Sequence, residues 1–438
     1  MLFYYGPHSA LLLPFVVPGA VATLWLLVRA WRRGAPADAL LALLILVPTL
    51  SVSQWMLGYA GWFDSHDGHS TVMFYVPWRA SMVLGGAYYL YFQSLTNQDF
   101  RWRPALKHLL PGLLEWAAFA AVAVYDLVWW RGVLGRPLPD FFGTKGRAAT
   151  LFDETALPAA LLGSVLLLVY GLRVLADYRR YARYLDDNFS DPERLRFAGL
   201  RQLLGLQALV LLLSLLFTTL NQIYDFSYDD AWYFFALRGV LIYGLIVVGL
   251  QANYAAATSP LRFGAAPRTQ MPTEAGLPAP PVSPPAAAAV ASIEPVTPAA
   301  PDEAPVSAIA SATEEAPPPV PELAPELLPW REKLLRLMAD EQPWLEPELT
   351  LTELAHRLRT HPALLSRVIN AGCGQNFNDF VNTYRVQEAQ RKLADPRFGH
   401  YSLVGVALES GFNSKSTFNR VFKKLLGQAP SEVMRPKS

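Results

Sequence analysis

The stretch that decides the fold of the C-terminal part is Ser410-Gly-Phe-Asn-Ser-Lys-Ser-Thr-Phe-Asn-Arg-Val-Phe-Lys-Lys-Leu-Leu-Gly427. Its first two residues, Ser410 and Gly411, end an apolar run that starts at Leu403. Asn413 and Ser414 follow, and both are residue types that cap a new helix. Apolar side chains then recur at helical spacing, and the predicted buried stripe consists of Phe418, Val421, Phe422 and Leu425. A helix, a glycine corner and a second helix are typical of a helix-turn-helix motif.

The opposite face of this second helix is polar and basic. Its side chains are Lys415, Ser416, Thr417, Asn419, Arg420, Lys423 and Lys424. Groups of this kind donate hydrogen bonds to base edges and to phosphates in the major groove of DNA. The pattern therefore predicts a helix that contacts DNA.

A similar unit precedes this one in the chain. Thr350 and Glu353 have the spacing of a capping box, which predicts the start of a helix. A corner follows, and Pro362 suits the first turn of the next helix. We expect that next helix to bury Leu365, Val368 and Ile369. A longer helix over residues 378–394 would join the two units.

The chain as a whole is too apolar for a soluble protein and too long for one ordinary domain, with 438 residues of which 52% are hydrophobic and 17% charged. Its first 254 residues contain seven apolar stretches long enough to cross about 30 Å of hydrocarbon. The stretches lie near residues 9–29, 39–61, 72–95, 108–130, 155–176, 199–221 and 232–254. We therefore expect residues 1–254 to form a seven-span transmembrane helix bundle.

Lys and Arg side chains gather in the loops that follow odd-numbered stretches, as Arg29, Arg32 and Arg33 do after the first one. The loops after even-numbered stretches hold few. Because cytoplasmic loops carry the excess of positive charge, the N-terminus is predicted to face outward. Seven crossings then place everything after residue 254 in the cytoplasm, at the inner membrane of a bacterium.

Residues 255–329 are rich in Pro and Ala and carry a net negative charge. They show no apolar periodicity, so no packed core can offset the entropy lost on ordering. We expect a disordered acidic linker between the membrane domain and a C-terminal domain at residues 330–438. Proteolysis within the linker would release the C-terminal domain, and the sequence leaves tethered action and release as alternatives.

Ionisable side chains inside the predicted spans are costly in hydrocarbon and call for a role. Arg79, Asp126 and Arg238 lie in the outer half, and Asn221 is grouped with them from the three amides at similar depth, Gln54, Asn221 and Gln222. Glu115 lies alone, nearer the cytoplasmic side. One interpretation is an ion pair of Asp126 with Arg79 or Arg238 that fixes the helix register. The other is an outward-open pocket for a small ligand, lined by these four residues and covered by the long loop between the fourth and fifth spans.

Motifs for cofactors and catalysis are missing from the sequence. The single cysteine, Cys373, excludes an internal disulfide and a cysteine-rich zinc site. No phosphate-binding loop, HExxH motif or Gly-x-Ser-x-Gly motif is present. We therefore expect no cofactor, no metal and no enzyme activity. A transporter or membrane enzyme with an appended DNA-binding tail remains the alternative.

Five blocks of the C-terminal domain carry a family resemblance. They are Leu-Thr-Leu-Thr-Glu-Leu-Ala (349–355), Leu-Ser-Arg-Val-Ile-Asn (365–370), Gly-Gln-Asn-Phe-Asn-Asp-Phe-Val-Asn (374–382), Tyr-Arg-Val-Gln-Glu-Ala (384–389) and Gly-Phe-Asn-Ser-Lys-Ser-Thr-Phe-Asn-Arg-Val-Phe-Lys-Lys (411–424). On these blocks, residues 349–435 resemble the DNA-binding domain of the AraC/XylS family of bacterial transcription regulators.

The resemblance implies two helix-turn-helix units that enter successive faces of the major groove at one asymmetric site. The implied base-contacting residues are Ala363, Ser366, Arg367 and Asn370 in the first unit and Lys415, Ser416, Thr417, Asn419 and Arg420 in the second. Arg367 and Arg420 suit bidentate contact with guanine, whereas Lys423 and Lys424 suit phosphates. At the first corner, Arg359 stands where the family usually has Gly, so a positive φ is expected at a non-glycine residue.

The membrane part resembles, more loosely, a subgroup of the same family with multi-span membrane domains, at Tyr89-Leu-Tyr-Phe-Gln-Ser-Leu-Thr96 and Asp187-Asn-Phe-Ser190. The two resemblances together imply a one-component regulator whose spans sense a signal and whose cytoplasmic domain binds DNA. The expected partners are double-stranded promoter DNA, the lipid bilayer and an unknown small-molecule or membrane-derived signal, and the sequence leaves a homodimer open.

Overall fold

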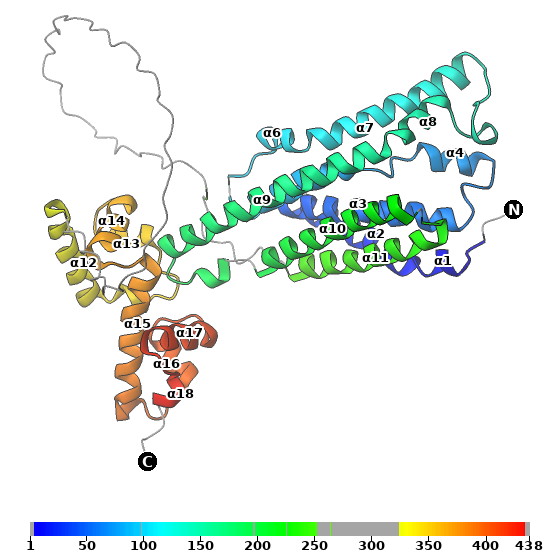
Figure 1. Ribbon diagram of the computed structural model, residues 1–438. Helices are drawn as coiled ribbons and strands as arrows, with labels where there is room; N and C mark the ends of the chain where they lie inside the picture. Colours follow the sequence, from blue (N-terminus) through cyan, green and yellow to red (C-terminus); the bar gives the residue numbers. More distant parts are fainter. Residues whose placement is uncertain are drawn as a thin grey trace, which may run out of the picture. The chain divides into compact units, whose positions relative to one another are not determined.

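The computed structural model describes residues 4–97, 99–195, 198–224, 226–251, 263 and 324–433 (Figure 1). Across these residues the chain is helical and forms no strand, only isolated β-bridges, which confirms the predicted all-α fold class. Most of the predicted disordered linker, residues 255–329, lies outside the described residues.

The N-terminal region is built from helices of unequal length. In chain order they are α1 (Pro7–Ala10), α2 (Leu13–Arg33), α3 (Pro36–Tyr59), α4 (Gly68–Tyr75), α5 (Ser81–Thr96), α6 (Trp102–Ala105), η1 (Leu106–His108), α7 (Leu110–Ala123), η2 (Val124–Val133), η3 (Phe141–Gly143), α8 (Arg147–Glu154), α9 (Ala156–Asn188), η4 (Pro192–Leu195), α10 (Ala198–Tyr224) and α11 (Tyr228–Gln251).

Several of these helices have the length and composition of membrane spans. Among the described residues, five are long and apolar enough to cross a membrane: Pro7–Arg33, Pro36–Tyr59, Leu110–Val133, Ala156–Asn188 and Tyr228–Val247. Ala208–Tyr224 is a shorter apolar helix. The count of seven spans therefore stays a prediction.

Helices α3 and α5 form the core of the N-terminal region. Helix α3 packs against α2, α5 and α11, and α5 also packs along α9. Helix α5 buries a continuous run of side chains from Val83 to Phe92. A glycine is required within this run, because a Cβ atom at Gly86 would lie 2.0 Å from the carbonyl oxygen of His108. The outer helices instead expose apolar side chains, such as Leu24 and Leu172, which a lipid environment would cover.

The third predicted span, residues 72–95, is two helices rather than one. Helix α4 ends at Tyr75 and α5 begins at Ser81, with extended backbone at Val76. Pro77 explains the break, because proline lacks an N–H group and disfavours helical geometry at the residue before it. Two indole N–H groups compensate: Trp78 donates to the Met73 carbonyl at 2.9 Å, and Trp116 donates to the Arg79 carbonyl at 3.1 Å.

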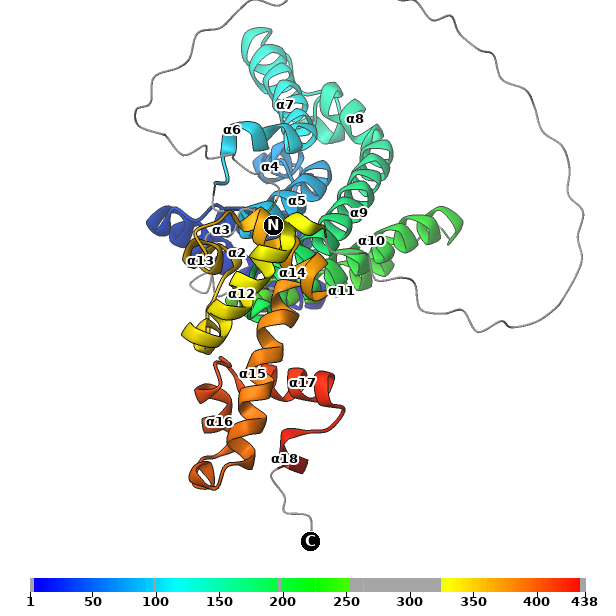
Figure 2. The same ribbon diagram turned by 90° about the vertical axis from the view of Figure 1, so that its left-hand side faces the viewer.

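The C-terminal region comprises η6 (Pro325–Leu327), α12 (Leu328–Glu341), η7 (Pro343–Leu345), α13 (Leu351–Arg357), α14 (Pro362–Cys373), α15 (Phe377–Ala394), η8 (Pro396–Phe398), α16 (Leu403–Glu409), α17 (Lys415–Leu426) and α18 (Pro430–Val433). Helix α15 lies between a group made of α12–α14 and a group made of α16–α18 (Figure 2). Helix α15 is thus the predicted connection between two helical units.

The second of these groups has its own hydrophobic core. Its buried members are Val386, Ala389, Val406, Ala407, Phe412, Phe418, Val421 and Phe422. Three residues of the predicted stripe on α17 are among them. Leu425 is not, because it is 38% exposed, and Leu426 packs against the core in its place.

Candidate nucleic-acid interface

The corner of the second helix-turn-helix unit depends on one glycine. Helix α16 ends at Glu409, and Gly411 follows with φ +85°. A Cβ atom at Gly411 would lie 2.4 Å from the carbonyl oxygen of Trp344, so a side chain is excluded by both the backbone angle and the space. The chain then turns into α17, whose first residue is Lys415.

Ser414 starts α17 as the sequence predicts. Its hydroxyl accepts a hydrogen bond from the backbone N–H of Thr417 at 3.2 Å. It also donates to the Thr417 hydroxyl at 3.0 Å, and Thr417 is only 6% exposed. Thr417 therefore belongs to the buried start of the helix. The residues of the predicted DNA-contacting set that α17 does expose are Lys415, Ser416, Asn419, Arg420, Lys423 and Lys424.

The first unit shows the predicted capping box. The Thr350 hydroxyl accepts from the backbone N–H of Glu353, and the Glu353 carboxylate accepts from the backbone N–H of Thr350. At the corner, Arg359 has φ +55°, as its place in the motif predicts. Helix α14 then begins at Pro362, with no side-chain hydrogen bond from the preceding His361.

Helix α14 buries one face and exposes the other. Leu365, Val368 and Ile369 are each 1% exposed, which confirms the predicted buried face. The predicted DNA-contacting residues Ala363, Arg367 and Asn370 are exposed, and Ser366 is half-buried.

Each corner contains a residue with positive φ, and each helix after a corner buries one face and exposes the other. Residues 354–436 match the family model described as "Helix-turn-helix domain". The C-terminal part of the chain is an AraC-type helix-turn-helix domain.

Similar proteins share this helix-turn-helix domain. An "Uncharacterized HTH-type transcriptional regulator YtdP" of Bacillus subtilis (strain 168) is 33% identical over 92 residues, which is 21% of this chain and 12% of that protein. An uncharacterized HTH-type transcriptional regulator of Staphylococcus aureus (strain COL) is 29% identical over 85 residues, 19% of this chain and 11% of the relative. The chain thus spans about an eighth or less of the length of these relatives. No solved structure matches.

Three cationic side chains of the predicted DNA-contacting set are held by carboxylates outside their own helices. The pairs are Arg367–Glu326 at 3.3 Å, Lys424–Asp379 at 2.7 Å and Arg420–Glu193 at 3.0 Å. All six side chains are at least 30% exposed, so each pair is worth no more than about 1 kcal/mol. DNA phosphates can therefore displace them.

A second candidate site is a cavity of about 110 Å³ among α3, α4, the extended segment after it, α7 and α8. Its charged lining residues are Arg79, Glu115 and Asp153. Arg79 forms an ion pair with Asp153, and its guanidinium carbon lies 4.7 Å from the centre of the Phe152 ring. Glu115 accepts a hydrogen bond from the backbone N–H of Met82 at 3.3 Å.

Asp126 is not part of this cavity, contrary to the sequence-based expectation. Its carboxylate accepts hydrogen bonds from the Tyr75 hydroxyl at 2.8 Å and from the backbone N–H groups of Ala149 at 2.9 Å and Ala148 at 3.3 Å. It therefore anchors the start of α8, where a negative charge is favourable. Among the described residues, neither of the two ion pairs considered for Asp126 is formed, because Arg79 pairs with Asp153 and Arg238 donates to the Ser51 hydroxyl.

The other two predicted ligand residues also lie outside the cavity lining. Arg238 donates to the Ser51 hydroxyl at 3.2 Å, and Asn221 is half-buried on α10. Of the four residues, only Arg79 lines the cavity. Asp153 was missed because it lies 74 positions from Arg79 in a segment expected to be a loop.

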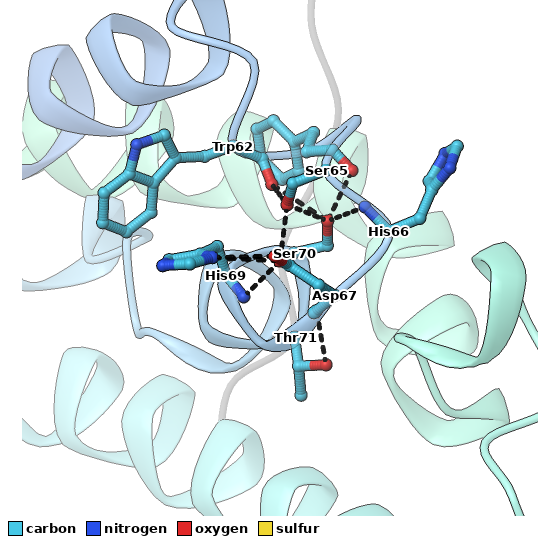
Figure 3. Close-up of polar contacts among 8 residues, drawn as sticks. Trp62, Ser65, His66, Asp67, His69, Ser70 and Thr71 are labelled. Carbon is cyan, nitrogen blue, oxygen red and sulfur yellow. Dashed lines mark hydrogen bonds and ion pairs between the residues drawn. The ribbon is translucent and has the colours of Figure 1, made fainter. Parts of the chain in front are cut away.

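Hydrogen bonds within the loop between α3 and α4 and the start of α4 hold this part of the chain in place (Figure 3). The Ser70 hydroxyl donates to the carbonyls of Trp62 at 3.0 Å and Phe63 at 2.8 Å, and it accepts from the backbone N–H of His66 at 2.9 Å. Asp67 caps α4 through the backbone N–H of His69, and hydrogen bonding from the His69 side chain holds the Asp67 pKa below its usual range. These bonds set the position of Phe63, which lines the cavity.

Proposed function

We propose that this protein is a membrane-embedded, one-component transcription regulator. In this proposal the helix-turn-helix domain binds promoter DNA, and the N-terminal helices respond to a small-molecule or membrane-derived signal. The observation that carries the proposal is the union of two parts in one chain: five helices long and apolar enough to cross a membrane, and a helix-turn-helix domain with exposed cationic faces.

Base recognition would come from the exposed residues of α14 and α17. Arg367 and Arg420 present guanidinium groups that can donate two parallel hydrogen bonds to guanine. Lys423 and Lys424 lie in the last turn of α17, where they suit phosphate contacts. Burial of Thr417 removes it from the set of direct base contacts.

The test compares two α17 variants of the full chain on a duplex enriched from a random-sequence library by the wild-type protein. Arg420→Ala should weaken binding by about 1–3 kcal/mol and relax sequence preference, whereas Lys423→Ala should weaken binding to all sequences and reduce the salt dependence. Arg336→Ala is the matched control, because Arg336 is exposed on α12 and pairs with Glu332. Undiminished binding by Arg420→Ala would remove Arg420 from the base contacts, and undiminished binding by both variants would remove α17 from the interface.

The proposed topology has the N-terminus outside and the helix-turn-helix domain in the cytoplasm of a bacterium, at its inner membrane. With Cys373 replaced by Ala, Asp64→Cys lies in the α3–α4 loop and Ser431→Cys lies in α18. A membrane-impermeant maleimide should label Asp64→Cys in intact cells and Ser431→Cys only after permeabilisation. The reverse labelling would invert the topology.

The cavity around Arg79 is the proposed signal site. Arg79 and Asp153 provide both charges next to aromatic rings, so a polar ligand could exchange for their mutual ion pair. Asp153 lies in α8, three residues before the first residue of α9, which places the site at the start of the longest helix. The alternative of a transporter or membrane enzyme draws no support from the reported relatives, both of which are named as transcriptional regulators.

A further inference from the structure

The chain immediately after α9 is held by the helix-turn-helix domain. Phe189 forms an isolated antiparallel bridge with Thr350, and the backbone N–H of Ser190 donates to the Leu349 carbonyl at 3.2 Å. Phe189 is 8% exposed, Ser190 1% and Asp191 9%. We call residues 189–193 the post-α9 segment.

Two buried side chains of α15 direct polar groups at this segment. The Asn378 amide donates to the carbonyl of Ser190 at 2.7 Å. The Arg385 guanidinium donates to the Ser190 hydroxyl at 3.1 Å, while its other hydrogen bonds go to the carbonyls of Trp344, Glu346 and Pro347. Buried polar groups seldom lack partners, so the domain surface around Asn378 is complementary to this backbone. The contact is a specific docking surface rather than a loose apposition.

The same segment reaches the DNA-contacting helix. Glu193 forms an ion pair with Arg420 at 3.0 Å. A guanidinium that donates to this carboxylate cannot at the same time donate two hydrogen bonds to guanine. The Glu193–Arg420 ion pair and bidentate recognition of guanine by Arg420 are therefore mutually exclusive.

Helix α9 connects this contact to the cavity. It is a continuous helix of 33 residues from Ala156 to Asn188, which corresponds to a length of roughly 50 Å. Its first residue follows α8, which contributes Phe152 and Asp153 to the cavity lining, and its last residue precedes Phe189. Helix α9 is thus one continuous helix between α8, which lines the cavity, and the docked segment.

We propose that the post-α9 segment is an autoinhibitory latch, which docks on the surface formed by residues 349–350, Asn378 and Arg385 and withholds Arg420 from DNA until the signal releases it. This inference rests on the proposed function, since it concerns regulation of DNA binding. The inference also assigns a role to the Asp187-Asn-Phe-Ser190 motif, because its last two residues form the docked backbone.

The test locks the latch with a disulfide in the full chain, embedded in lipid nanodiscs. Cys373, the sole cysteine, is replaced by Ala, and Phe189→Cys and Thr350→Cys are introduced. Directly opposed residues of an antiparallel pair have Cα atoms about 4.5–5.5 Å apart, which suits a disulfide. The probe is a duplex enriched from a random-sequence library by the wild-type full chain. We expect the oxidised protein to bind it severalfold more weakly than the reduced protein, with Phe189→Cys alone as the control for oxidation.

A second variant opens the latch. Ser190→Pro removes the N–H that donates to Leu349 and the hydroxyl that contacts Arg385, outside the end of α9. Phe189 is already extended, with φ −127° and ψ 136°, as a residue before proline prefers. This variant should bind the duplex severalfold more tightly than the wild type.

The outcomes separate the latch from the proposed function. Failure of the cysteine pair to cross-link, or equal binding by the oxidised and reduced forms, would overturn the latch while leaving DNA binding in place. Absence of binding in every form, the opened Ser190→Pro variant included, would overturn the proposed function itself.

Discussion

Substitution of Gly411 by Ala should destabilise the second helix-turn-helix unit through two separable effects. A non-glycine residue at φ +85° costs about 1–2 kcal/mol. In addition, the new Cβ would lie 2.4 Å from the Trp344 carbonyl oxygen, which accepts the hydrogen bond of the Arg385 Nε atom at 2.8 Å. Displacing that oxygen weakens a hydrogen bond from a buried charge, worth about 1.5–3 kcal/mol. The expected total is about 3–5 kcal/mol.

Gly374 provides a matched control within the same domain. It also has a positive φ, +66°, but a Cβ atom there would meet nothing within 4 Å. Gly374→Ala should therefore show the backbone effect alone, about 1–2 kcal/mol. Amide hydrogen exchange of the full chain, followed by mass spectrometry of peptides from α14, α16 and α17, measures the free energy of local opening for each variant.

Equal decreases in the free energy of local opening in Gly411→Ala and Gly374→Ala would show that the contact with the Trp344 carbonyl has no effect. An unchanged opening free energy for α16 and α17 in Gly411→Ala would refute the argument from the backbone angle as well. Since Arg385 also contacts the post-α9 segment, the opening free energy around Ser190 should fall in Gly411→Ala and stay unchanged in Gly374→Ala.

Two further predictions concern the first corner and the start of α8. Arg359→Gly relieves a positive φ that costs about 1–2 kcal/mol, but it adds unfolded-state entropy worth about 0.5–1 kcal/mol. Amide hydrogen exchange across α13 and α14 should therefore show that the free energy of local opening rises by about 0.5–1 kcal/mol. A decrease would show that Arg359 makes a compensating contact. Asp126→Ala removes a charged acceptor from the N–H groups of Ala148 and Ala149, which should lower the stability of the start of α8 by about 1.5–3 kcal/mol. The rate of amide hydrogen exchange in α8 should rise at least tenfold. An unchanged rate would contradict the anchoring role of Asp126.

Local rules predicted the helix-turn-helix domain in considerable detail. The capping box of Thr350, the start of α14 at Pro362, the cap at Ser414 and the strained corner at Arg359 each depend on side chains within a few residues. The errors on α17 are errors of rotation. Since each residue turns a helix by about 100°, the sequence could not distinguish Leu425 from Leu426, or place Thr417 beneath the exposed face.

The N-terminal region was predicted less well because its polar residues find partners far away in the sequence. Arg79 pairs with Asp153, and Asp126 accepts from Tyr75 and from the backbone of α8. The depth of a residue in a span restricts which partners it can reach, but it does not identify them. Hydropathy averaged over a long window also joined α4 and α5, since a single proline such as Pro77 changes the average little.

The break between α4 and α5 gives two tryptophans a role as hydrogen-bond donors. Trp78 and Trp116 each donate an indole N–H to a carbonyl that the interrupted helix leaves without a backbone donor. Phenylalanine at either position would keep most of the apolar ring area but would lose the N–H donor. A substitution that is conservative in size would therefore remove a hydrogen bond. The need for these two indole donors therefore depends on Pro77. A variant with a continuous helix here would tolerate replacement of both tryptophans, whereas a chain that keeps the proline would not.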